Sequence, residues 1–456
     1  MRCEAPNCGA EIPLIRSFWL CKKANQKRAL RFVATKWAEA KKEPSELHIS
    51  IFEPQQDSEV GPGTVSRAKA RCLSCGAILP PDRVRAQLVA QRGGADVIFN
   101  KKGERTGGAL ILAVVTLREG LSGRRYRLSA ERDYAAVLAA QKGLSKLCGQ
   151  KLANGLCAIP DEPTPVGGGS GAGRAFSVQN YGMMTFADLF TARQKLALVN
   201  LRKCISELPT KDGAAKEIAG LALSRFTDIC NAFCRWESTK TQVRNLFTRQ
   251  ALPMLWDFAE PGLFADQAGD YTVTLGSMAR VIAAMPTGIR SGQVQTADAT
   301  ASPHNDASMD VFFSDPPYYD AIPYSDLSDF FLPLRVPLVH FYLATRQADH
   351  RRALRGAGHR DRQVLDEGMK CIRHVTVAIE KIQHLIEENQ DSAAGSFVKS
   401  SQCFRTGRFG LRRRPKGFDA LFAGQLMGNV EPRRLLALAR VPCIPDEGGN
   451  LRHWDG

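Results

Sequence analysis

The chain has 456 residues, of which 44% are hydrophobic and 24% are charged. This composition excludes a collagen-like or broadly disordered protein, and the length predicts about three domains. The longest uninterrupted apolar run, residues 109–115, is far shorter than the ~20 residues that span a bilayer. We therefore expect no membrane helix. Because the N-terminus also has no apolar signal sequence, we expect the protein in the cytoplasm.

The charge balance favours a polyanionic partner. Lys and Arg outnumber Asp and Glu by 62 to 46, which gives a formal net charge of +16. DNA is the partner that such a balance suggests first, although many basic proteins bind no polyanion. The 13 cysteines are numerous for a chain in a reducing compartment, where disulfides do not persist. Their spacing has to show whether some of them hold a metal ion.

Four cysteines form two similar knuckles. Cys3 and Cys8 are a C-x4-C pair followed by Gly-Ala, and Cys72 and Cys75 are a C-x2-C pair followed by Gly-Ala. A glycine after the second cysteine lets the backbone turn tightly, so that both thiolates of a pair can face one ion. Four thiolates are the closed tetrahedral set of a structural zinc site. The spacing predicts Zn²⁺ at these residues; the alternative is two unrelated turns with reduced thiols.

The first part of the chain predicts β structure. Residues 1–130 contain short strand patterns and turns, which indicate a small β module around the zinc ribbon. Strands are expected at residues 30–33, 47–51 and 109–117. Residues 131–175 are expected to form a linker, because they contain prolines and the glycine-rich run 167–173.

The pattern then becomes helical, and residues 176–265 predict a helical insertion. A capping box opens the first expected helix, over residues 185–208, and an apolar stripe continues along it. A second helix is expected over residues 214–236. In it, Cys230 and Cys234 are interpreted as core thiols rather than metal ligands.

The chemistry is concentrated after one apolar segment. Residues 309–313 predict a buried strand that runs into Asp315-Pro316-Pro317-Tyr318. In open α/β sheets, ligands bind just beyond the carboxyl ends of the strands. Two successive prolines fix an extended backbone and leave the Pro316 carbonyl free to accept a hydrogen bond. The segment thus combines a carboxylate, a fixed carbonyl and an aromatic ring.

This combination suits the exocyclic amino group of adenine or cytosine. The lone pair of that group is delocalised into the ring, so a catalyst must localise it before it can attack a methyl group. Asp315 and the Pro316 carbonyl can accept hydrogen bonds from its two N–H bonds, and Tyr318 can stack on a base extruded from the duplex. The alternative is a proline-stiffened turn after a core strand.

Residues 314–331 resemble a known family. Asp315-Pro316-Pro317-Tyr318 matches the catalytic motif of the amino-group DNA methyltransferases, and the longer string is similar to the zinc-ribbon-containing adenine-specific DNA methylases known as the DUF1156 group. The resemblance also covers residues 8–20, 181–182, 188–194 and 249–260.

The resemblance implies transfer of a methyl group from S-adenosylmethionine to N6 of adenine in DNA. It implies an α/β fold: a partial Rossmann-like S-adenosylmethionine-dependent methyltransferase fold with an inserted zinc-ribbon β module and a helical segment. Residues 266–331 would hold the catalytic strand and motif. Asp298 would lie beside the adenine of the cofactor; a loop acid is the alternative role for that residue.

The chain departs from the family in two places. The family's glycine-rich cofactor loop has no counterpart before Cys3, and the glycine run 167–173 lacks the strand and helix that such a loop needs. We therefore expect a chain truncated at its N-terminus, inactive unless another polypeptide supplies that loop. The second departure begins after Phe331, where residues 332–456 form a basic region that is dense in arginine at 332–363. A solvated tail, an out-of-frame translation and a DNA-backbone contact are the three interpretations of this region.

A function of a different class also fits the sequence. The two knuckles and the net positive charge suffice for a non-catalytic zinc-ribbon protein that binds nucleic acid.

Overall fold

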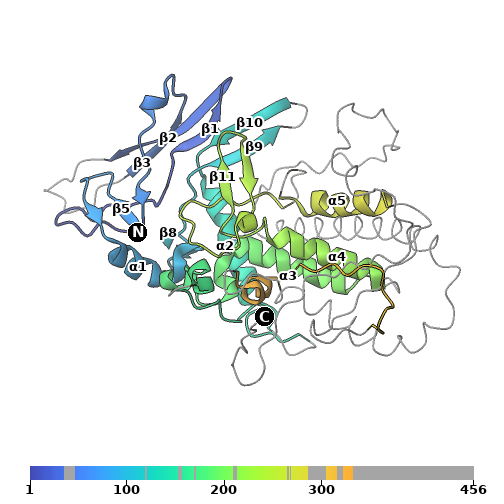
Figure 1. The fold of residues 1–456 in the computed structure, drawn as a ribbon. Helices are drawn as coiled ribbons and strands as arrows, with labels where there is room; N and C mark the ends of the chain where they lie inside the picture. Colours follow the sequence, from blue (N-terminus) through green and yellow to red (C-terminus); the bar gives the residue numbers. More distant parts are fainter. Residues whose placement is uncertain are drawn as a thin grey trace. The chain divides into compact units, whose positions relative to one another are not determined.

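A computed structural model describes the part of the chain that carries the cysteine knuckles and the helical core (Figure 1). The described residues are 1–34, 47–118, 121–152, 157–168, 171–208, 213–263, 267, 269–285, 304–315 and 322–331. The chain divides into two compact units. The first holds residues 1–285 and 320–383, and the second holds residues 286–319 and 384–456.

The first unit begins with a three-stranded antiparallel sheet. Its strands are β1 (Trp19–Lys23), β2 (Gln26–Ala34) and β3 (Leu47–Phe52), in the order β1-β2-β3. Ile15, Phe18 and Leu30 form a small buried cluster on this sheet, which is how short strands become stable. The strands expected at residues 30–33 and 47–51 are confirmed, and they lie between the two cysteine knuckles.

A second small sheet carries the second knuckle. It contains β4 (Val65–Ser66), β5 (Lys69–Arg71) and β6 (Ile78–Leu79), all antiparallel. Arg67 and Ala68 join β4 to β5 with φ angles of 47° and 60°, the positive values that a tight two-residue hairpin turn requires. Helix α1 (Pro81–Val89) follows directly, with proline in its first turn.

Two hairpins and a helix come next. The strands are β7 (Val97–Phe99) with β8 (Arg105–Gly108), and β9 (Val114–Arg118) with β10 (Leu121–Arg127). The strand expected at 109–117 therefore begins five residues later than its pattern suggests. Helix α2 (Glu131–Ser145) occupies the start of the expected linker. It packs against α3 so closely that a Cβ at Gly143 would lie 3.1 Å from the Leu196 side chain, and burial against a neighbour is what makes the segment a helix.

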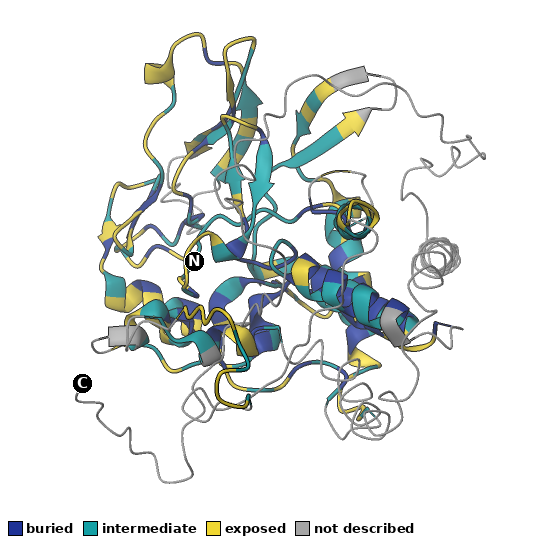
Figure 2. Cartoon of the chain, turned by 45° about the vertical axis from the view of Figure 1, so that its right-hand side comes forward, coloured by how far each residue is buried: buried dark blue, intermediate teal, exposed yellow. Residues whose placement is uncertain are grey.

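The remaining elements form the helical core. They are α3 (Ala192–Ser206), α4 (Gly213–Thr227), β11 (Arg235–Glu237), β12 (Gln242–Arg244), α5 (Tyr271–Ala283) and α6 (Tyr324–Asp329). Helix α3 packs on both α2 and α4, and α4 packs on α5. Figure 2 shows that buried residues gather along these helices, whereas the strands are mostly intermediate or exposed.

The helix boundaries differ from those expected. The capping box at residues 185–188 exists, but it caps a single 3₁₀ turn, Phe186–Leu189. The long helix starts after Thr191, whose hydroxyl accepts a hydrogen bond from the Gln194 amide at 3.2 Å. This second capping box starts a separate helix, so the single helix expected over residues 185–208 does not form. The helix expected over 214–236 ends at Thr227.

Cys230 and Cys234 are core thiols, as predicted. Both are fully buried, and burial raises the pKa of each thiol. They lie in the turns after α4 rather than within a helix. Packing therefore explains both residues without a metal ion.

All five sheets among the described residues are antiparallel and have two or three strands. The Rossmann-like sheet that the resemblance implies is not seen among the described residues and stays a prediction. Within those ranges, no helix combines the length and the apolar character that crossing a bilayer requires.

Candidate metal centre and neighbouring motifs

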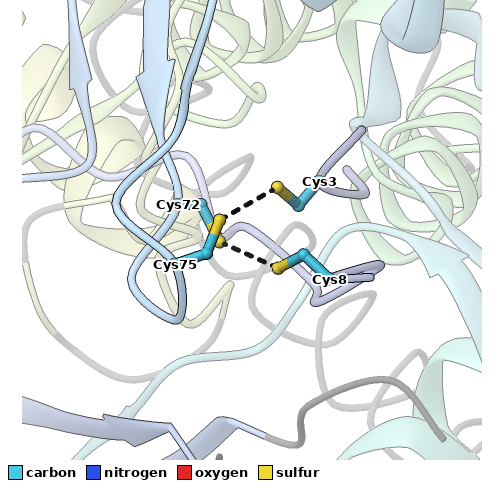
Figure 3. Close-up of side chains that lie close together, drawn as sticks. All are labelled: Cys3, Cys8, Cys72 and Cys75. Atoms are coloured by element: carbon cyan, nitrogen blue, oxygen red, sulfur yellow. Dashed lines mark hydrogen bonds between the residues drawn. The ribbon is translucent and has the colours of Figure 1, made fainter. Parts of the chain in front are cut away.

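The four knuckle cysteines come together at one point (Figure 3). The Cys3 and Cys75 sulfurs lie 3.6 Å apart, and the Cys8 and Cys72 sulfurs lie 3.7 Å apart. All four sulfurs lie within 4.8 Å of one another. Zn–S bonds of ~2.3 Å in a tetrahedron place the sulfurs about 3.8 Å apart. The four thiols therefore form a group that could hold a metal ion.

Each knuckle is shaped by a turn that only a few residue types adopt. Gly9 and Gly76, which follow the second cysteine of each pair, have φ angles of 58° and 76°, the left-handed region that glycine tolerates. In the wider first knuckle, Asn7 also has a positive φ of 58°. The extra residues of the C-x4-C pair are thus absorbed in the turn, and both sulfurs still face the second knuckle.

Burial and backbone amides define the electrostatics of the cluster. Cys3, Cys8 and Cys72 are at most 5% exposed, whereas Cys75 is exposed. Burial raises the pKa of Cys3 and of Cys72. At Cys75, burial raises the pKa, but hydrogen bonds from the Ala77 amide and neighbouring thiols outweigh it, so the pKa is lowered. Backbone amides that point at sulfur stabilise the thiolate that a metal needs.

Ion pairs tie the first knuckle to the elements that follow the second. Arg83 of α1 donates two hydrogen bonds to the Glu4 carboxylate, at 2.8 and 2.9 Å. Arg105 of β8 donates to both oxygens of Glu11, at 3.1 and 2.5 Å. Val84 of α1 is fully buried against the same cluster as the cysteines. Both knuckles are therefore held by contacts beyond the sulfurs.

The predicted catalytic segment is only partly described. The strand expected at residues 309–313 is wrong for the described chain: no strand forms there, and Phe312 and Phe313 are 76% and 77% exposed. An apolar run becomes a strand only when neighbouring strands satisfy its backbone hydrogen bonds, and none among the described residues pairs with it. Asp315 is exposed. The other predicted residues of the site, Asp298, Pro316, Pro317 and Tyr318, lie outside the described residues.

The segments that carry the family resemblance contact one another in the first unit. The Arg16 side chain donates to Asp257 at 2.5 Å, and its amide donates to the same carboxylate at 3.1 Å. The Tyr181 and Trp256 rings meet edge to face with centroids 5.2 Å apart. Residues 249–260 therefore lie against both residues 8–20 and residues 181–182.

Two more of these contacts complete the arrangement. Arg193 pairs with Glu260, which joins residues 188–194 to residues 249–260. The Phe190 and Phe330 rings stack with centroids 5.7 Å apart, so the segment that follows the Asp-Pro-Pro-Tyr motif packs on the helical core. The resemblance includes these residues, but the sequence does not predict their pairing, because charge and aromatic type alone do not select partners.

Comparison with known proteins adds no identification. The chain matches no family model, no curated protein and no solved structure.

Proposed function

We propose that the chain is a zinc-ribbon DNA amino-methyltransferase polypeptide, in which Cys3, Cys8, Cys72 and Cys75 hold a structural Zn²⁺ ion. The sulfur geometry is compatible with zinc, because an all-thiolate tetrahedral set with three buried ligands suits a closed structural site. In this role the ion fixes the two knuckles and takes no part in the reaction.

The observation that supports the enzyme is the convergence of the resembling segments. The resembling segments come from four separate regions of the sequence, yet they form a continuous set of contacts: 8–20, 181–194, 249–260 and the end of 314–331. Segments selected only by their likeness to a methylase family would not be expected to pack together by chance. Their packing supports a common module that holds the resembling segments of the first unit.

In the proposed reaction, the N6 amino group of adenine takes a methyl group from S-adenosylmethionine and loses one proton. Asp315 accepts a hydrogen bond from an amino N–H and thereby localises the nitrogen lone pair, with the Pro316 carbonyl as the second acceptor. Tyr318 stacks on the extruded base. Asp298 is proposed to lie beside the adenine of the cofactor. When bound, the cofactor would supply the methyl group: the bond between its sulfonium sulfur and the methyl carbon breaks as the bond to N6 forms, the neutral thioether leaves, and the amino proton passes to solvent.

Zinc is tested by metal content. The purified chain should contain one Zn²⁺ per polypeptide by mass spectrometry of the metal, and Cys8→Ser should lose most of it. Cys21→Ser is the matched control, because Cys21 is fully buried but lies outside the four-cysteine group. Equal zinc content in Cys8→Ser and wild type would remove the proposed site.

The enzyme is tested with labelled S-adenosylmethionine. Because we expect the chain to need another polypeptide for the glycine-rich loop, both measurements use the zinc-loaded chain mixed with a polypeptide that supplies that loop. Calorimetry should show that this mixture binds the cofactor, and label should pass to unmethylated duplex DNA. Asp315→Ala should abolish transfer, whereas Asp310→Ala, an exposed acid on the same segment, should not. Failure of both cofactor binding and transfer would contradict the enzyme.

A second candidate function is a non-catalytic zinc-ribbon protein that binds nucleic acid. Its support is that the four-cysteine group and exposed basic residues such as Lys69 and Arg71 belong to the first unit, whereas none of the proposed catalytic residues, at positions 298 and 315–318, does. DNA binding by the zinc-loaded chain, without cofactor binding and without any effect of Asp315→Ala, would favour this candidate.

A further inference from the structure

The small sheet of the second knuckle presents one basic face. Strand pairing places Ser66 opposite Lys69, and Arg71 opposite Ile78. Because side chains alternate along a strand, these four residues share the outward face, while Val65, Ala70 and Leu79 are buried on the other. We call the four outward residues the ribbon face.

Charge on the ribbon face is uncompensated. Lys69 and Arg71 are both exposed, and neither forms an ion pair with any residue that the structure describes. The face itself contains no carboxylate. Its fourth residue, Ile78, is 65% exposed.

The neighbouring sheet shows the contrasting arrangement. Lys22 and Lys27 both pair with Asp57, at 2.9 and 3.2 Å, and Arg28 pairs with Glu53 at 2.7 Å. Those cations already have carboxylate partners within the protein and have less to gain from an external anion. Lys69 and Arg71 differ from these three cations in having no carboxylate partner among the described residues, and from other exposed cations in their fixed spacing on one strand.

Rigid placement is the second property of the ribbon face. Lys69 and Arg71 lie two residues apart on β5, a spacing of about 6.6 Å along the strand. The turn at Arg67 and Ala68 closes the hairpin at one end, and Cys72 anchors β5 at the other. Cations on a fixed strand can contact adjacent phosphates of one backbone without a large loss of conformational entropy.

We infer that the ribbon face binds the phosphate backbone of duplex DNA through Lys69 and Arg71, with Ser66 as a hydroxyl donor and Ile78 as an apolar contact to sugar or base edges. This inference rests on the proposed function, because it names the surface through which that function engages DNA. It assigns a DNA contact to the zinc ribbon.

The test compares two double variants of the full-length, zinc-loaded chain. Lys69→Ala/Arg71→Ala removes two positive charges from the ribbon face. Lys101→Ala/Lys102→Ala removes two from the exposed turn between β7 and β8 and is the matched control. Zinc content and circular dichroism check that both variants fold. Binding to a fluorescent DNA duplex is measured by anisotropy at several salt concentrations.

The ribbon-face variant should bind about tenfold more weakly near 0.15 M salt, and its slope of log affinity against log salt should be shallower by about 2, one unit per lost phosphate contact. The control should stay near wild type. Equal effects of the two variants, or an unchanged slope, would overturn the ribbon face while leaving DNA binding intact. No DNA binding by the wild type would instead refute the proposed function. Tighter binding to duplex RNA than to duplex DNA would overturn DNA as the partner.

Discussion

Arg193 and Glu260 are joined by two parallel hydrogen bonds, at 2.9 and 2.8 Å, across 67 positions of sequence. Arg193 lies in the first turn of α3, and Glu260 ends the segment that also contacts the first knuckle region through Asp257. Burial by itself would lower the pKa of Arg193, but the Glu260 carboxylate outweighs that effect and the pKa is raised. The pair thus fastens the helical core to the long segment that precedes α5.

Removing one partner of this pair should destabilise the protein. Arg193→Met leaves the Glu260 carboxylate, which is 18% exposed, without its cation, and we expect the free energy of unfolding to fall by about 2 kcal/mol. Glu260→Gln should cost less, since it keeps one acceptor. Urea unfolding of the two single variants and the double variant gives the coupling energy. Additive losses would show that the two residues do not stabilise each other.

Phe330→Ala should be strongly destabilising. Phe330 is 1% exposed. The distances from its ring centroid to those of Phe190, Phe247 and Phe186 are 5.7, 5.3 and 6.4 Å. Deleting a buried phenyl ring typically costs about 3–5 kcal/mol. Phe312→Ala is the matched control, because Phe312 is 76% exposed and should change stability by less than about 0.5 kcal/mol.

The same control also tests the strand expected at residues 309–313. Thermal unfolding followed by calorimetry measures both variants. If Phe312→Ala cost as much as Phe330→Ala, Phe312 would be buried, and the interpretation of 309–313 as a core strand would be restored.

Asp133 should make a pH-dependent contribution to stability. Its carboxylate accepts two hydrogen bonds from Arg127, at 2.6 and 2.8 Å, and one from the Ala130 amide at 2.7 Å. The Arg127 hydrogen bonds are the largest cause of a lowered pKa for Asp133. A carboxylate whose pKa is lower in the folded state stabilises the fold above its ordinary pKa, near 3.9, and this contribution is lost as the pH falls through the lowered value.

We therefore expect Asp133→Asn to reduce the free energy of unfolding by about 1–2 kcal/mol at pH 7. The gap between variant and wild type should close as the pH falls below about 4. Urea unfolding of the variant and the wild type at a series of pH values measures this difference in the free energy of unfolding. A gap of constant size down to pH 3 would mean that the ionised carboxylate does not carry the effect.

Metal removal should loosen the knuckles more than the helical core. Chelation takes away the ion that would hold four thiolates together, and burial then opposes their charge. Hydrogen exchange should become faster for the Cys3 amide, which donates to Ala10, and for the Cys72 amide, which donates to Ala77. Amides of α3 and α4 are the internal control and should keep their protection. Equal exchange at Cys3 and Cys72 before and after chelation would contradict a structural metal.

The sequence by itself determined the elements whose signals are local. The four cysteines with their glycines predicted the cluster, because ligand type and turn geometry lie within a few residues of each other. The alternation of apolar residues was sufficient to predict the strands at residues 30–33 and 47–51. The burial of Cys230 and Cys234 was also predicted correctly from the sequence. The helix expected to contain them, over residues 214–236, instead ends at Thr227.

Only the tertiary structure decided what depends on distant partners. Residues 131–145 became a helix because α3 covers their apolar side, and residues 309–313 formed no strand because no described strand pairs with them. The pairing of Arg193 with Glu260 and the sharing of one face by Lys69 and Arg71 arise from chain packing and strand register. Composition and periodicity carry no information about either, because both depend on which segments meet in space.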